Sequence, residues 1–145
     1  MGRKRIMKAN EYQKMAMRTN DGKSTDRVIS GVLTCDLKWL HNQNVVREDT
    51  EGLDLGGVLN GCLGLAGESG EVLDMVKKWV FHEKKMDKYH LKKEIGDVMW
   101  YVAMLCESFG FNLDEILQMN IDKLKARYPE GFDTVRANNR AEGDV

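Results

Sequence analysis

The sequence predicts an all-α protein, and three observations support this fold class. Only one proline, Pro129, occurs in 145 residues, so little interrupts long helices. β-Branched residues are sparse, and no segment alternates polar and apolar residues as a half-buried strand would. Hydrophobic residues make up 42% of the chain, which is enough for a buried core, and the length suits a single domain.

Two helices are expected in the N-terminal third of the chain. The first covers residues 10–19, with Asn10 as its N-cap, and residues 19–22 form a turn after it. The second runs from residue 24 or 25 to about residue 41, because apolar residues recur there at helical spacing. Residues 42–55 are mostly polar and are expected to form a surface loop.

The third helix is expected to begin between residues 54 and 58 and to end near residue 81 or 82. It contains many glycines, each of which costs roughly 0.5–1 kcal/mol relative to alanine inside a helix. A helical glycine is useful where another backbone or a ligand comes close. For Gly61 and Gly64, tight packing against another helix and close approach of a ligand both remain open.

The fourth and fifth helices have clear end signals. The fourth is expected over residues 88–109, and Gly110 is a natural residue to end it. Asn112 is then the N-cap of the fifth helix, with Glu115 at the third helical position as in a capping box. We expect this helix to end near residue 127 or 128, just before Pro129.

The charge balance and the cysteines limit the partners and the compartment. The chain has 22 basic and 23 acidic residues, which argues against a nucleic-acid-binding surface but not against small phosphorylated ligands. Apolar runs are far shorter than the roughly 18 residues of a membrane-spanning helix, and no secretion signal follows the basic N-terminus. The three cysteines form no CxxC pair, so we expect a cytoplasmic protein with no membrane partner.

Two pairs of carboxylates are the strongest sign of chemistry: Glu68 with Glu71 in the third helix, and Glu94 with Asp97 in the fourth. Residues three apart share a helix face, so two antiparallel helices could bring all four acids together. At about 100° per residue, both pairs lie on or beside the apolar face, where a carboxylate without a partner is costly. Four such groups stay ionised only near a cation, and oxygen ligands suit Mg²⁺, with Mn²⁺ as a substitute.

A plainer interpretation pairs these acids with lysines, because Lys77, Lys78, Lys92 and Lys93 are near in sequence. Only Lys78 lies close to the side of Glu71. A bound divalent metal ion neutralises the negative charge of four acids more fully than one lysine does.

A di-iron site is another alternative for acids in a helical bundle. Such sites need Glu-x-x-His on two helices, and none of His41, His82 and His90 lies three residues after a glutamate. We therefore discount di-iron and expect the histidines to be surface or ordinary core residues.

Three motifs follow one another along the chain at residues 63–72 (LGLAGESGEV), 93–102 (KEIGDVMWYV) and 120–132 (NIDKLKARYPEGF). Together they resemble the MazG-like nucleotide pyrophosphohydrolases, and the ordered set is specific where any one motif would be weak. Residues 10–13 (NEYQ), with Arg18 and Thr19, are similar to the short, phage-type members. One departure is Gly67, where the family often has a glutamate.

The resemblance implies an all-α, four-helix-bundle-like enzyme completed by a second subunit, as a homodimer or homotetramer. Such an enzyme cleaves a nucleoside triphosphate between the α and β phosphates and releases a nucleoside monophosphate and pyrophosphate, with Mg²⁺ as cofactor. Two other functions remain open: a helical nucleotide- or metal-binding regulatory module with weak hydrolysis, and a structural oligomerising bundle whose acids form salt bridges.

The resemblance also implies roles for individual residues. Glu68, Glu71, Glu94 and Asp97 would hold Mg²⁺, and Glu71 could take the proton of the attacking water. The implied substrate contacts are Asn120 with the base or sugar, Lys123 and Arg127 with the phosphates, Lys78 with a phosphate or a carboxylate, and Tyr101 stacked on a base. For Lys123 and Arg127 a solvated basic face is equally plausible. For Tyr101, as for Trp39 and Trp79, packing is the more common role.

The domain organisation follows from the extent of the resemblance. Residues 9–133 form the MazG-like domain. Residues 1–8 are expected to be a flexible N-terminus or a cloning remnant, and the polar residues 134–145 a flexible tail.

Overall fold

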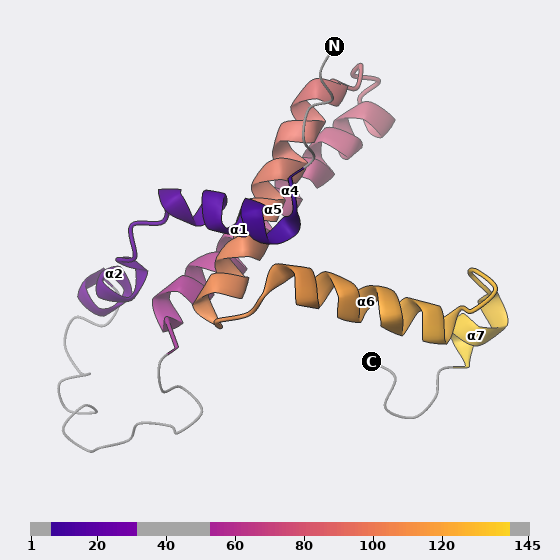
Figure 1. Ribbon diagram of the computed structural model, residues 1–145. Coiled ribbons are helices and arrows are strands. Elements are labelled where there is room, and N and C mark those ends of the chain that lie inside the picture. The colour runs from indigo at the N-terminus through magenta and orange to yellow at the C-terminus, as the bar shows by residue number, and fades with distance from the viewer. Residues whose placement is uncertain (1–6, 32–52, 140–145) are drawn as a thin grey trace, which may run out of the picture.

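A computed structural model describes residues 7–31 and 53–139, and over these ranges every regular element is a helix (Figure 1). This confirms the all-α fold class. The elements are α1 (Ala9–Ala16), the 3₁₀ helix η1 (Met17–Thr19), α2 (Ser24–Gly31), α4 (Leu55–Phe81), α5 (Lys88–Ser108), α6 (Leu113–Arg127) and α7 (Thr134–Asn138).

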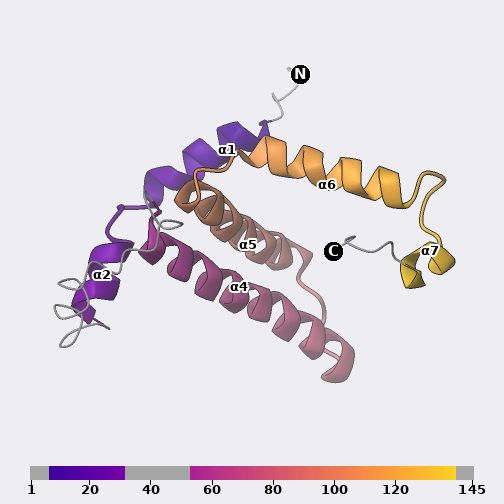
Figure 2. The same cartoon turned by 90° about the horizontal axis from the view of Figure 1, so that it is seen from below.

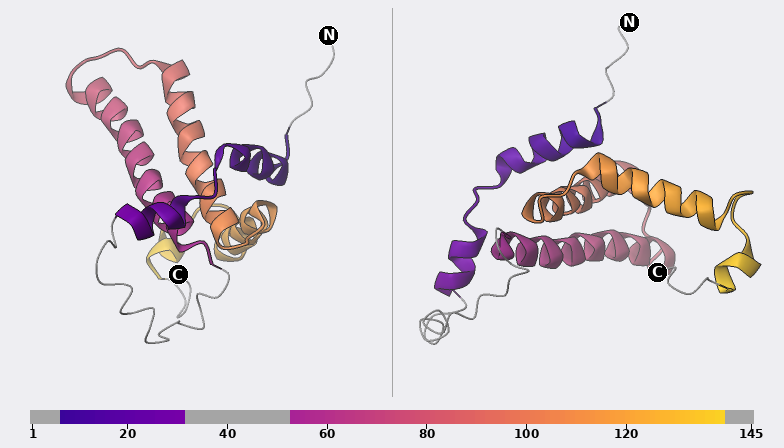
Figure 3. Two further views of the ribbon diagram at one scale, coloured as in Figure 1. Left: turned by 90° about the vertical axis from the view of Figure 1, so that its left-hand side faces the viewer. Right: turned by 60° about the horizontal axis from the view of Figure 1, so that its bottom comes forward.

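The antiparallel hairpin of α4 and α5 is the centre of the fold (Figure 3). Asp54 begins α4 by accepting a hydrogen bond from the backbone N–H of Gly57 (3.0 Å). Asp87 begins α5 by accepting from the N–H groups of Tyr89 and His90. Gly110 follows the end of α5 with a φ of +67°, a conformation that favours glycine. The expected bounds of the third and fourth helices are therefore confirmed.

Glycines let the two hairpin helices approach closely. A Cβ added at Gly61 would lie 2.8 Å from the side chain of Leu105, and one at Gly64 would overlap the ring of Tyr101. Tight helix packing, one of the two open interpretations, is thus what these two glycines provide. Gly67, one turn further along α4, has open space where a Cβ would be.

This difference predicts opposite effects for the same substitution on one helix. Gly64→Ala should lower the free energy of unfolding by about 1–3 kcal/mol, because the methyl group overlaps Tyr101. Gly67→Ala should raise it by about 0.5–1 kcal/mol, because alanine is the better helix former and meets nothing. Urea unfolding followed by circular dichroism measures both, and equal stabilisation by the two variants would show that Gly64 is not a packing residue.

Helix α1 joins the hairpin to α6. The side chain of Gln13 accepts a hydrogen bond from the N–H of Leu113 and donates one to the carbonyl of Phe111, each 3.0 Å long. Asn10 Oδ1 accepts from the N–H of Asp114 (2.9 Å). The prediction that Asn10 caps the first helix is therefore wrong: Lys8 is the N-cap of α1, and Asn10 satisfies the start of α6 instead.

The last helices differ in how well their expected bounds agree with the structure. Asn112 caps α6 by accepting from the N–H of Glu115 (3.2 Å), and α6 ends at Arg127, both as predicted. The short helix α7 lies in the segment expected to be a flexible tail. Asp133 begins it by accepting from the N–H of Arg136 (2.8 Å), a capping signal within a polar stretch.

The core formed by the described residues is small. Met104 and Leu113 are the large side chains that are fully buried among the described residues. By contrast, large apolar side chains on α4 and α6 are exposed, including Leu63 (74%), Leu73 (68%) and Met119 (64%). Figure 2 shows α4 on one side of α5, and α1 and α6 on the other. Over the described ranges, α4 and α6 therefore leave large apolar side chains uncovered.

Several sequence-based expectations fall outside the residues that the structure describes. They are the second helix beyond residue 31, the loop over residues 42–52, and the roles considered for Trp39 and His41. Within the described parts of the chain, each helix is either too short or too polar to cross a bilayer.

Candidate metal centre

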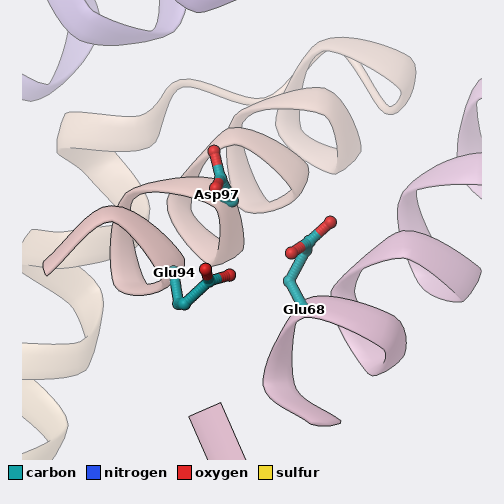
Figure 4. A group of neighbouring side chains, drawn as sticks. All are labelled: Glu68, Glu94 and Asp97. Carbon is teal, nitrogen blue, oxygen red and sulfur yellow. The ribbon is translucent and has the colours of Figure 1, made fainter. Parts of the chain in front are cut away.

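Three carboxylates meet where α4 and α5 face each other (Figure 4). Glu68 comes from α4, and Glu94 and Asp97 come from α5, with one oxygen of each within 4.8 Å of the others. The antiparallel hairpin places them together, because residues 94 and 97 share the face of α5 that meets α4. Glu68 and Glu94 are partly buried, and Asp97 is exposed. The predicted meeting of the two acidic motifs therefore occurs for three of the four acids.

Glu71 is not part of this cluster in the structure, although the sequence predicted four acids in one place. It is exposed, and its charge acts on the ammonium group of Lys78. Three residues along a helix correspond to a shift of about 4.5 Å and a rotation of about 60°. Glu94 and Asp97 have the same offset and yet converge, so spacing alone does not place Glu71, and its roles as metal ligand and base stay predictions.

Two of the four lysines considered as partners for the acids are engaged with a different acid. Lys77 and Lys78 both pair with Asp74, and the hydrogen bonds from Lys77 and then Lys78 lower the pKa of Asp74 to about 2. Among the described residues, no lysine or arginine pairs with Glu68 or Asp97. The salt-bridge interpretation therefore fits Asp74 and not the cluster.

A histidine contacts the cluster from the first turn of α5. The Nε2 atom of His90 lies 2.6 Å from Oε1 of Glu94. His90 is an exposed surface residue, as expected of the histidines, but its contact with Glu94 was not predicted. The spacing of His90 and Glu94, four residues apart on a helix, was the signal that could have revealed it.

Helix α1 borders the cluster through Tyr12. The hydroxyl of Tyr12 donates to the carbonyl of Gly96 (3.4 Å), beside Asp97. Burial and then the negative charge of Asp97 raise the pKa of Tyr12. Nearby, Trp100 Nε1 donates to Thr19 Oγ1 (2.8 Å) and so fixes η1 against α5. The position of Tyr12 beside the cluster becomes visible only in the tertiary packing of α1 on α5.

Two predicted substrate contacts, Lys78 and Tyr101, have partners within the chain. Lys78 pairs with Asp74. Tyr101 packs over Gly64, and its ring meets that of Trp100 edge to face, with 4.9 Å between the ring centres. The packing role considered for Tyr101 is thus observed, whereas Trp79 is 53% exposed and is not a core residue.

The other predicted substrate contacts lie on α6. Asn120, Lys123 and Arg127 share one face of this helix by their spacing. Helix α6 packs on α1 and then projects away from the hairpin (Figure 1). Within a single chain it is therefore not packed over the carboxylate cluster.

The ligand set fits a hard divalent cation. It consists of carboxylate oxygens from two rigid helices, and Mg²⁺ and Mn²⁺ prefer such oxygens. Three negative charges this close repel one another, and a cation between them would remove that repulsion.

Comparison with known proteins agrees with the order of motifs. The family model of the MazG nucleotide pyrophosphohydrolase domain matches residues 58–132, which include Glu68, Glu71, Glu94 and Asp97. The chain is also similar to the Gene 37 protein of Mycobacterium phage L5, at 36% identity over 83 residues. That alignment covers 54% of this chain and 72% of the phage protein. No solved structure gives a significant match.

Proposed function

Because this chain belongs to the MazG nucleotide pyrophosphohydrolase family, we propose that it hydrolyses a nucleoside triphosphate, ribo- or deoxyribo-, between its α and β phosphates. The products are a nucleoside monophosphate and pyrophosphate. The observation that carries the proposal is the convergence of Glu68, Glu94 and Asp97 across two helices.

The cluster is chemically suited to a triphosphate only together with a cation. Three carboxylates repel a triphosphate, so Glu68, Glu94 and Asp97 must hold Mg²⁺ for the two to meet. When bound, Mg²⁺ offsets charge on the phosphoryl oxygens and orients the attacking water. Manganese can substitute, because it accepts the same oxygen ligands.

Glu71 is our candidate for the general base. It lies one turn from Glu68, outside the cluster and exposed to solvent, so its carboxylate is accessible to a water molecule. A carboxylate that is not a metal ligand keeps both oxygens for accepting a proton. The alternative is that Glu71 joins the ligand set when a cation binds, and the Glu71→Gln variant distinguishes these two roles.

A second copy of the chain would complete the bundle. Large apolar side chains are exposed on α4 and α6, and contiguous exposed apolar surface commonly marks an interface. Pairing two chains as a dimer, or two dimers as a tetramer, would cover them. It would also bring α6 of one copy toward the hairpin of another.

In such an assembly, residues of α6 would contact the nucleotide. We propose that Asn120 contacts the base or the sugar. We also propose that Lys123 and Arg127 contact the phosphates, because positively charged side chains form strong hydrogen bonds with phosphate oxygens. Lys78 and Tyr101 are at the hairpin and would line the same site. The free thiols of Cys62 and Cys106 suit a reducing compartment such as the cytoplasm.

One observation favours a second function. Because Glu71 stands apart from the three clustered acids, the chain could bind metal and nucleotide while hydrolysing slowly, as a regulatory module. A purely structural bundle is less well supported, because Glu68 and Asp97 have no basic partner among the described residues.

The test is incubation with each NTP and dNTP in the presence of Mg²⁺, with separate assays for pyrophosphate and orthophosphate. We expect pyrophosphate and monophosphate in equal amounts from at least one nucleotide, and none when EDTA is present. Orthophosphate as the product would place the cleavage elsewhere. Nucleotide binding without any product would support the regulatory module instead.

A further inference from the structure

Beside the carboxylate cluster, His90 and Glu94 form a close contact that none of the proposed roles uses. His90 Nε2 lies 2.6 Å from Glu94 Oε1, one helical turn away on α5. The side chain of Glu94 is only 14% exposed, whereas that of His90 is 56% exposed. The covered carboxylate is thus contacted by an imidazole nitrogen from the solvent side.

Such a contact could be an ordinary helix-surface pair, which typically contributes about 0.2–0.5 kcal/mol. Two features distinguish it from that. Its acceptor is a member of the cluster that includes Glu68 and Asp97, and it occupies one defined oxygen of the acceptor. A hydrogen bond to one carboxylate oxygen fixes the rotation of the group and leaves the other oxygen for a cation.

We propose that His90 is a positioning residue for the metal centre, which holds the carboxylate of Glu94 in the orientation that binds the divalent cation. The inference rests on the proposed function, because it assigns a cation to the cluster. The contact needs only an N–H on Nε2, which both the neutral Nε2–H tautomer and the protonated ring supply.

The backbone keeps His90 in place for this role. Its N–H donates to Asp87 Oδ1 (3.0 Å), the carboxylate that begins α5. The imidazole therefore projects from a capped first turn, with Glu94 one turn further into the helix. Asp87 caps the start of α5, whereas His90 contacts the carboxylate of Glu94. The effect of each residue can therefore be tested separately.

Three variants test the proposal by metal binding. His90→Phe keeps a flat ring but removes the donor, and His90→Gln keeps an amide N–H that can reach Glu94. His82→Phe is the matched control, because it makes the same change at an exposed histidine at the end of α4. Calorimetric titration of each metal-free protein with Mn²⁺ and with Mg²⁺ gives the affinities, and the Mg²⁺ dependence of turnover gives the concentration for half-maximal rate.

We expect His90→Phe to weaken cation binding by roughly 10-fold, within the ~10–100-fold that partners of metal ligands typically contribute. His90→Gln should recover most of the affinity, and His82→Phe should match the wild type. The turnover of His90→Phe at saturating Mg²⁺ should stay near the wild-type rate. The unfolding midpoint of metal-free His90→Phe should also be unchanged. If the contact were merely structural, its loss would lower the midpoint and leave the cation affinity unchanged.

The inference is overturned if His90→Phe binds cations as tightly as the wild type, or more tightly, or if His90→Gln loses as much affinity as His90→Phe. These outcomes can be distinguished from a failure of the proposed hydrolysis. A wild type that binds Mn²⁺ but releases no pyrophosphate would end the hydrolase proposal while the comparison of His90 variants still stands.

Discussion

Asp97→Asn should lower turnover by at least ~100-fold, more than the loss of an outer-shell partner usually causes. It should also abolish the thermal stabilisation of the protein by Mg²⁺. The substitution keeps the shape of the side chain but removes one of the three charges that converge at the hairpin. Stabilisation by a ligand depends on its concentration relative to Kd, so a weakened site shows as a lost thermal shift. The measurements are pyrophosphate release and unfolding midpoints with and without saturating Mg²⁺.

Glu71→Gln is the matched comparison, because Glu71 lies outside the cluster. If Glu71 is the base, this variant should lose ~10²–10⁴-fold in turnover yet keep the Mg²⁺-induced thermal shift. Loss of the shift in Glu71→Gln would instead make Glu71 a fourth ligand. Both variants should retain the helical circular dichroism signal, since both side chains are exposed. An Asp97→Asn protein that keeps full turnover would remove the metal centre from the proposal.

Met104→Ala should have the largest effect on stability, lowering the free energy of unfolding by about 2–5 kcal/mol. Met104 is fully buried on α5, and the amide of Asn60 on α4 lies 3.6 Å from its sulfur. The substitution therefore opens a cavity between the two hairpin helices, in a core with few other large members. Urea or thermal unfolding of the metal-free protein measures the change.

Met15→Ala provides the control, because it is the same truncation at a residue of α1 that is 50% exposed. A change within about 0.5 kcal/mol is expected there, as for most surface substitutions. Met15→Ala could instead lower the free energy of unfolding as much as Met104→Ala does. In that case the exposure of Met15 in the single chain would not predict its effect on stability. That result would indicate that α1 is covered in the assembled protein.

Local signals were sufficient for most helix boundaries. Asp54, Gly110 and Asn112 act on backbone groups within four residues, so their effect can be read from neighbouring letters of the sequence. Asn10 shows where this reasoning fails. Its side chain has the chemistry of a cap, but its hydrogen-bond partner is Asp114, more than 100 residues away in the chain.

The acidic cluster was predictable in part. Spacing of three residues indicated that Glu94 and Asp97 share a face, and the structure brings them to Glu68. Periodicity gives the direction of a side chain to within tens of degrees, which is too coarse to separate Glu71 from Glu68. Whether two oxygens lie within a few ångströms depends on how closely α4 and α5 approach, and Gly61 and Gly64 control that approach.

The composition, the end signals of the helices and the order of the three motifs, all visible in the sequence, sufficed for an all-α fold and the family of this protein. Packing between distant segments determined which acids converge and placed Tyr12 beside Asp97. The physical reason is the range of the interactions: caps and helical periodicity act within a few residues. A ligand set, by contrast, is made by helices whose separation is determined only when their side chains pack.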